Sequence, residues 1–141
     1  RGEFADAGAR TPESLQQAYE TTLIETVETV GVGTVVDETE LDRATVEALV
    51  AGESPTLDLT DAAAILALDE DRPSADAIAA EARDILLMGM TTAVLDVETL
   101  AAGVEGELEP KEIQQKIEGR FPMTVAEFAL LHQFIEQRKG D

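Results

Sequence analysis

The chain has 141 residues and no cysteine, and its 30 acidic against 10 basic residues give a formal net charge of −20. The lack of cysteine excludes disulfides and thiolate metal sites and fits a reducing interior, so we expect a cytoplasmic protein. A chain of this length can bury about two-thirds of its unfolded surface, as one compact domain or as two small helical units that share a core.

Hydrophobic residues argue against disorder, which such a net charge with few aromatic residues would otherwise indicate. They make up 44% of the chain, and many are Ala, Val and Leu at helical spacing, which predicts a packed core. The longest apolar stretch begins at Ile85 and ends at Leu95, far short of the roughly 20 residues that span a bilayer. We therefore expect no membrane segment and interpret this stretch as core or as a subunit interface, which makes a homodimer one alternative.

In the first half, three segments start with a residue that can cap a helix N-terminus. They start at Thr11, Asp42 and Asp58 and should end near Gly31, at Gly52 and near Leu68. A short segment over residues 34–40 lies between the first two. The acidic run at residues 69–73 is the expected boundary between one helical unit at residues 11–71 and a second at residues 74–139. Residues 1–10 are interpreted as a tag remnant and a flexible N-terminus.

In the second half, four helices are predicted to follow capping residues at Ser74, Asp96, Glu109 and Thr124. The first either continues across Gly89 to about residue 95 or bends there, because glycine weakens a helix. Pro110 favours a helix start after Glu109, and Thr124 with Glu127 forms a capping box. No useful length of chain alternates with period two. The predicted fold is all-α, with two tandem units joined by a long middle helix.

The two halves are similar when compared with an offset of 67 residues. The matched pairs are Leu41 and Leu108, Asp42 and Glu109, Val46 and Ile113, Val50 and Ile117, Gly52 and Gly119, and Pro55 and Pro122. The next caps, Asp58 and Thr124, match after a gap of one residue. The pattern predicts a structural repeat of a short helix, a turn, a capped helix that ends in glycine, and another capped helix.

Residues 35–55, VVDETELDRATVEALVAGESP, resemble the lambda-repressor-like helix-turn-helix. In that resemblance the parts are a scaffold helix with Val35 and Val36, a turn with Leu41, a recognition helix with Thr45 and Val46, and Gly52 at its end. Glu40 stands where the family usually has a glycine in the turn. We therefore expect the turn to have a backbone conformation that differs from the one usual in the family. Residues 100–122, LAAGVEGELEPKEIQQKIEGRFP, resemble the same family more loosely, because their turn is longer. Together the resemblances cover residues 35–68 and 97–135.

The acidic, lysine-poor and alanine-rich composition resembles that of proteins from halophilic archaea, whose surface carboxylates are screened at very high salt. The whole chain also resembles a group of small acidic haloarchaeal proteins. This second resemblance implies no activity.

The helix-turn-helix resemblance implies DNA binding through polar residues of a recognition helix in the major groove. The first unit offers Arg43 and Thr45 among several acids. The second offers the better set, namely Lys111, Gln114, Gln115, Lys116 and Arg120. Residues 1–107 carry 5 basic and 24 acidic residues, whereas residues 108–141 carry 5 and 6, so the net charge changes from −19 to −1. Counterion release contributes less to DNA affinity at high salt. A shortage of basic residues therefore weakens DNA binding less in a high-salt cytoplasm than at low salt.

Other kinds of site are not predicted. The chain has no glycine-rich phosphate loop followed by lysine, no nucleophile elbow and no histidine pair, so we expect neither an enzyme nor a cofactor. The single histidine, His132, is expected at the surface or rim, and the group with Met88 is expected in the core or a dimer contact. The run at residues 69–71 lacks the spacing of a calcium loop and is expected to be a solvated linker rather than a metal site.

Three functions fit these patterns. The first is a DNA-binding transcriptional regulator in which the second unit reads the DNA. The second is a protein-interaction module on a helix-turn-helix-like scaffold that does not bind DNA. The third is an acidic DNA mimic.

Overall fold

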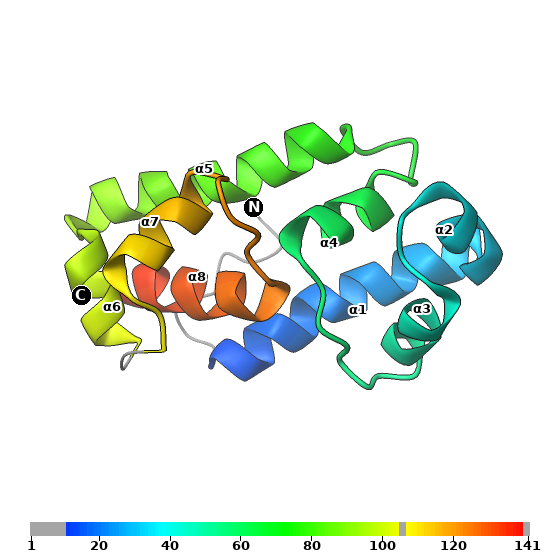
Figure 1. Cartoon of the computed structure of the whole chain (residues 1–141), viewed down its shortest axis with the longest axis horizontal. Coiled ribbons are helices and arrows are strands. Elements are labelled where there is room, and N and C mark those ends of the chain that lie inside the picture. Colours follow the sequence, from blue (N-terminus) through cyan, green and yellow to red (C-terminus); the bar gives the residue numbers. More distant parts are fainter. Residues whose placement is uncertain (1–10, 105–106, 140–141) are drawn as a thin grey trace.

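Eight helices form the secondary structure of residues 11–104 and 107–139, which the computed structural model describes (Figure 1). They are α1 (Pro12–Val30), α2 (Val32–Glu38), α3 (Arg43–Val50), α4 (Leu59–Leu66), α5 (Ala75–Ala93), α6 (Val97–Gly103), α7 (Pro110–Ile117) and α8 (Val125–Lys139). The predicted all-α class is confirmed. The predicted tag remnant and flexible N-terminus at residues 1–10 lie outside the described residues.

The helices begin where the sequence places capping residues. The side chains of Thr11, Ser74 and Asp96 each accept a hydrogen bond from the backbone N–H three residues later. Thr124 and Glu127 form a reciprocal box, with N–H to oxygen distances of 3.0 and 3.1 Å. Such caps satisfy N–H groups that have no partner within the helix, and each contributes about 1 kcal/mol.

The predicted repeat is visible in the lengths of the first three helices of each half, whereas α4 has eight residues and α8 has 15. The helices α1 and α5 have 19 residues each, α2 and α6 have seven, and α3 and α7 have eight. Backbone angles agree as well, because Gly52 and Gly119, at equivalent turns, have φ values of 81° and 82°. We therefore describe the chain as two units, α1–α4 and α5–α8.

An antiparallel backbone bridge joins the two units at equivalent residues. Leu59 N–H donates to the Met123 carbonyl at 2.6 Å, and Val125 N–H donates to the Leu57 carbonyl at 2.8 Å. Since α4 begins at residue 59 and α8 at residue 125, the offset at the bridge is 66. Each unit thus contributes the same donor and the same acceptor positions, which relates the units by an approximate two-fold axis.

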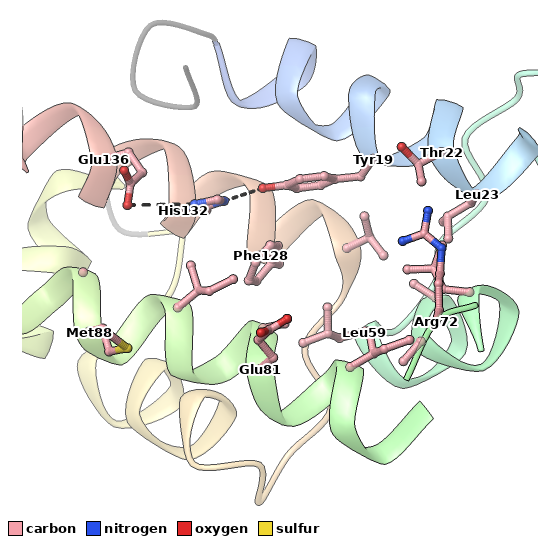
Figure 2. A pocket seen from close by; sticks show the side chains of 18 of the residues that line it. Tyr19, Thr22, Leu23, Leu59, Arg72, Glu81, Met88, Phe128, His132 and Glu136 are labelled. Carbon is pink, nitrogen blue, oxygen red and sulfur yellow. Dashed lines mark hydrogen bonds and ion pairs between the residues drawn. The ribbon is translucent and has the colours of Figure 1, made fainter. Parts of the chain in front are cut away.

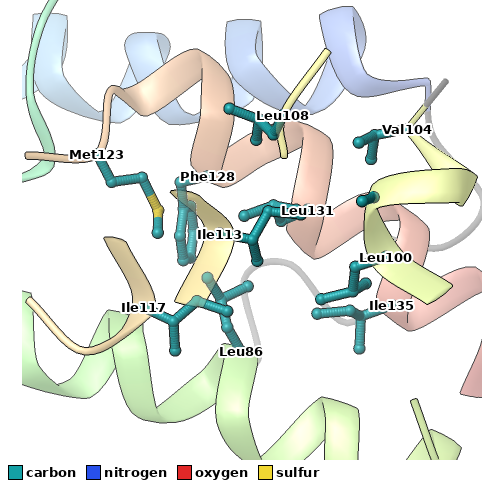
Figure 3. Packing of buried hydrophobic residues seen from close by; sticks show 11 residues of the cluster. Leu86, Leu100, Val104, Leu108, Ile113, Ile117, Met123, Phe128, Leu131 and Ile135 are labelled. Atoms are coloured by element: carbon teal, nitrogen blue, oxygen red, sulfur yellow. The ribbon is translucent and has the colours of Figure 1, made fainter. Parts of the chain in front are cut away.

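The first helix of each unit packs against the last helix of the other. The helix α1 lies along α8, and α5 lies along both α4 and α8 (Figure 1). One buried cluster lies mainly in the second unit and includes Leu86, Leu100 and Ile135 (Figure 3). The other, around Val35 and Ile65, includes Val125 from the second unit. Both units therefore contribute to a shared core.

The long helix α5 continues as one helix through Gly89 to Ala93, in agreement with the first of the two alternatives predicted for it. The glycine allows close approach of α8, since a Cβ atom at residue 89 would lie 2.6 Å from Cγ2 of Ile135. The apolar stretch at residues 85–95 is divided between core and surface, because Leu86 is buried whereas Leu87 and Met88 are exposed.

Within the described residues, no single helix is long and apolar enough to cross a membrane. Helices α5 and α6 together reach such a length and composition, with a bend of 96° between them.

Val94, which follows α5, has a left-handed backbone at φ 56° and a side chain that is 89% exposed. This conformation is unfavourable for a β-branched residue, and the equivalent position at the end of α1 is Gly31. We expect Val94→Gly to raise the free energy of unfolding by about 1 kcal/mol, because it relieves strain and removes no buried contact. Denaturant unfolding measures the change. Gly31→Ala is the matched control and should lower stability, and a loss of stability in Val94→Gly would contradict the interpretation.

Candidate ligand-binding groove

An open groove of about 370 Å³ lies between α1 and α4 of the first unit and α5 and α8 of the second (Figure 2). Equivalent residues line its two sides: Leu59 faces it from α4 and Val125 from α8, again at an offset of 66. The groove therefore lies across the approximate two-fold axis, and neither unit forms it alone.

Most of the side chains that line the groove are apolar. Those from the first unit include Leu23, Ala62 and Leu66, and those from the second include Ile78, Ile85 and Phe128. An apolar surface of this kind gains free energy when it is covered, in proportion to the area removed from water.

A tyrosine and a histidine form a polar wall in this apolar groove. The hydroxyl group of Tyr19 on α1 is hydrogen-bonded to Nδ1 of His132 on α8. The two rings are nearly parallel, and Phe128 packs against both, with ring centroids 5.4 Å from Tyr19 and 5.3 Å from His132. On its other side, His132 Nε2 lies 4.0 Å from a carboxylate oxygen of Glu136. We assign the ring proton to Nε2, so that Nδ1 accepts from the Tyr19 hydroxyl.

The prediction that His132 lies at the surface or rim is wrong. Its side chain is buried, with 7% of the residue exposed, because α1 covers this face of α8. Burial lowers the pKa of the imidazole, and the nearby carboxylate of Glu136 opposes this only in part. His132 is therefore neutral at pH 7.

An arginine lines the groove between the helices at another point. Arg72 lies in the turn after α4, and Figure 2 shows its guanidinium near Thr22 and Leu23 of α1. Its nearest carboxylate oxygen, on Asp69, is 3.8 Å from Nε. Nε is buried and has no hydrogen-bond partner in the described part of the chain.

The residues predicted to read DNA from the second unit have different surroundings. Lys111, Gln114 and Arg120 are exposed, although Gln114 and Arg120 both hydrogen-bond to Glu118, and Gln115 is half-buried. The side chain of Lys116 is only 13% exposed. Three of the five candidates therefore reach solvent, two on α7 and Arg120 in the turn that follows it.

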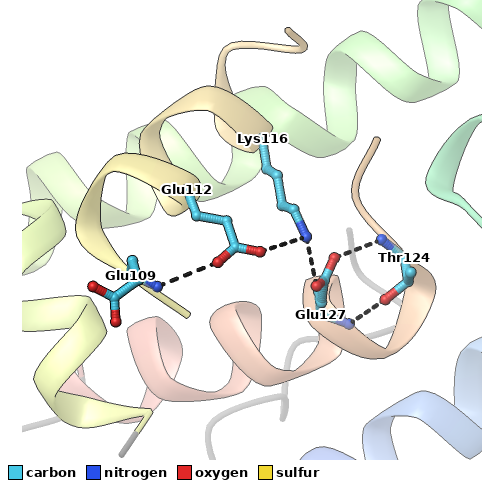
Figure 4. Close-up of polar contacts among 5 residues, drawn as sticks. All are labelled: Glu109, Glu112, Lys116, Thr124 and Glu127. Atoms are coloured by element: carbon cyan, nitrogen blue, oxygen red, sulfur yellow. Dashed lines mark hydrogen bonds and ion pairs between the residues drawn. The ribbon is translucent and has the colours of Figure 1, made fainter. Parts of the chain in front are cut away.

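Lys116 ties α7 to α8. Its ammonium lies 2.6 Å from Glu127 of the α8 capping box and 3.2 Å from Glu112 of the α7 capping box (Figure 4). Burial lowers the pKa of Lys116, but hydrogen bonds to the two carboxylates outweigh this effect and raise it overall. The lysine stays charged and serves as an internal ion-pair partner in this arrangement.

The first unit presents its two candidates at the far end of the molecule, since α3 and α7 lie toward opposite ends (Figure 1). Arg43 is exposed and pairs with Glu47 at 4.0 Å. Thr45 is half-buried, and its N–H donates to the capping carboxylate of Asp42. Within the described residues, no group of three or more His, Asp and Glu side chains could hold a metal ion.

These features define an all-α protein of two similar four-helix units with a groove between them. The chain belongs to the family of unknown function DUF5791, whose profile matches residues 15–138. No curated protein and no solved structure matches the chain.

The buried histidine predicts a pH dependence of stability. Since the folded-state pKa of His132 lies below its unfolded value of about 6.5, the unfolded chain takes up a proton first as the pH falls. The contribution of His132 to the free energy of unfolding is complete above about pH 6.5 and is lost as the pH falls toward the folded-state pKa. As the pH falls from about 7.5 to about 5.5, we expect the free energy of unfolding, measured with denaturant, to fall less for His132→Gln than for the wild type.

Gln137→His is the control, because it adds an exposed imidazole to the same helix and should leave the wild-type slope unchanged. Equal slopes for His132→Gln and the wild type would rule out this role of the buried imidazole.

Proposed function

We propose that this protein binds a small ligand with an apolar body in the groove between its two units. The observation that carries the proposal is the groove itself, an open and mainly apolar space of about 370 Å³ whose polar side chains include Tyr19, Arg72 and His132. Ligand sites in proteins typically have volumes of about 300–1,000 Å³, mostly apolar walls and a small number of placed polar groups.

The packing around the groove supports binding without large rearrangement. Leu23 and Val125 are buried on opposite units, so these parts of the walls are fixed by the core. A ligand in the groove would contact both units and would stabilise the folded chain by mass action. The function we infer is therefore that of a ligand-binding module.

A DNA-binding regulator that reads through α7 is the second candidate. It is favoured by Lys111 and Gln114, which are exposed three residues apart on one helix face, in the part of the chain with a net charge of only −1. Lys116 is not a suitable position for a test of DNA binding, because its replacement would leave two neighbouring glutamates without their cation. Side chains of Lys and Gln can hydrogen-bond base edges.

The ligand-binding proposal is tested with Ile85→Gln combined with Met88→Gln. Both side chains line the groove and neither is fully buried, so the substitution should weaken binding and leave the fold intact. We expect the affinity for the uncharged dye Nile red, measured by fluorescence titration, to fall about tenfold, which corresponds to 1.4 kcal/mol.

Leu87→Gln is the matched control, because Leu87 is also exposed on α5 but does not line the groove. It should bind the dye as the wild type does. Equal affinity in all three proteins would show that the dye does not bind in the groove.

The regulator candidate is tested by recovery of crosslinked DNA from cells that express the tagged protein. We expect discrete sites for the wild type, and we expect Lys111→Glu combined with Gln114→Ala to lose them, because base-edge and phosphate contacts are removed. Arg43→Glu, a charge change on α3, should retain these sites. A folded wild-type protein that recovers no enriched DNA would end this candidate.

A further inference from the structure

Arg72 is an unusual cation among the described residues because its buried Nε has no hydrogen-bond partner. A guanidinium carries five N–H donors, and leaving a buried donor without a partner is costly. The Arg72 side chain is 33% exposed, its Nε is buried without a hydrogen-bond partner among the described residues, and Asp69 at 3.8 Å is beyond hydrogen-bond distance. The exposed part of the side chain lines the groove.

Arg72 has one ion-pair partner, Asp69 at 3.8 Å, and the other cation that lines the groove has a closer one. The ammonium of Lys139 lies 3.0 and 3.2 Å from the two carboxylate oxygens of Glu136. Glu81, on α5, also has an interaction partner. Arg72 makes the longer ion pair and has no hydrogen bond at Nε among the described residues, so it is the cation of the groove that is more available to a ligand.

We infer that the groove binds a monoanionic amphiphile, an unbranched apolar chain with a carboxylate head, and that Arg72 holds the head. The inference rests on the proposed ligand-binding function and adds the chemistry of the ligand. A planar guanidinium matches the two oxygens of a carboxylate in a bidentate pair. One available cation suits a single negative charge better than a phosphate monoester, which carries a charge of about −1.5 to −2.

The rest of the groove suits the tail. The lining also includes Leu66, Ile78 and Ile85, which are aliphatic, and Gly89. An apolar tail in this space would cover the aliphatic walls, and it has no polar group that would lose water on burial.

The test uses three probes that share a ten-carbon chain: decanoate, decan-1-ol and decylammonium, each kept below micelle-forming concentration. Affinities are measured by competition with Nile red. For the wild type we expect decanoate to bind about tenfold more tightly than decan-1-ol, and decylammonium to bind most weakly. Arg72→Gln should bring decanoate to the affinity of decan-1-ol and leave the affinity for decan-1-ol unchanged.

Arg43→Gln is the matched control, because it removes an exposed arginine far from the groove and should keep the preference for decanoate. Equal affinities of the three probes for the wild type, tighter binding of decylammonium, or an undiminished decanoate preference in Arg72→Gln would each overturn the role of Arg72 while the groove remains a binding site. If neither Nile red nor any of the probes binds the wild type, the proposed ligand-binding function itself fails. Binding of decan-1-ol to Arg72→Gln shows that the variant is folded.

Discussion

The arrangement of the molecule depends on two backbone hydrogen bonds, from Leu59 to Met123 and from Val125 to Leu57. Buried backbone groups must find partners, and here each unit supplies the partner that the other lacks. The pairing fixes where α4 and α8 start, side by side and related by the approximate two-fold axis. Helices α1 and α5 then pack across the units, and the groove is the space left between these four helices.

The elements that could be predicted are those set by nearby residues. A cap such as Thr124 with Glu127 acts over three residues, so its signal is complete in a short stretch of sequence. The repeat was also readable, because it preserves Gly52 and Gly119 at turns that require a positive φ. Whether α5 bends at Gly89 could not be read locally, since the decisive contact is with Ile135 on another helix.

The groove was not predictable for the same reason. His132 has no partner close in sequence, and the residue that buries and binds it, Tyr19, is 113 positions away. Lys116 has the pattern of a solvated lysine on a helix face, yet Glu127 reaches it from the next helix. The sequence shows which residues are charged. It does not show which charged side chains lie close together, because that depends on how the two units pack.

The repeat has a consequence for how a ligand would be oriented. Leu66 on α4 and His132 on α8 are equivalent at an offset of 66, and both line the groove. Two identical separate chains would place the same side chain at both of these points, and an elongated molecule could enter such a site in either direction. Because one chain carries both units, Leu66 lies at one of these points and His132 at the other, which gives the groove distinguishable ends and so a direction.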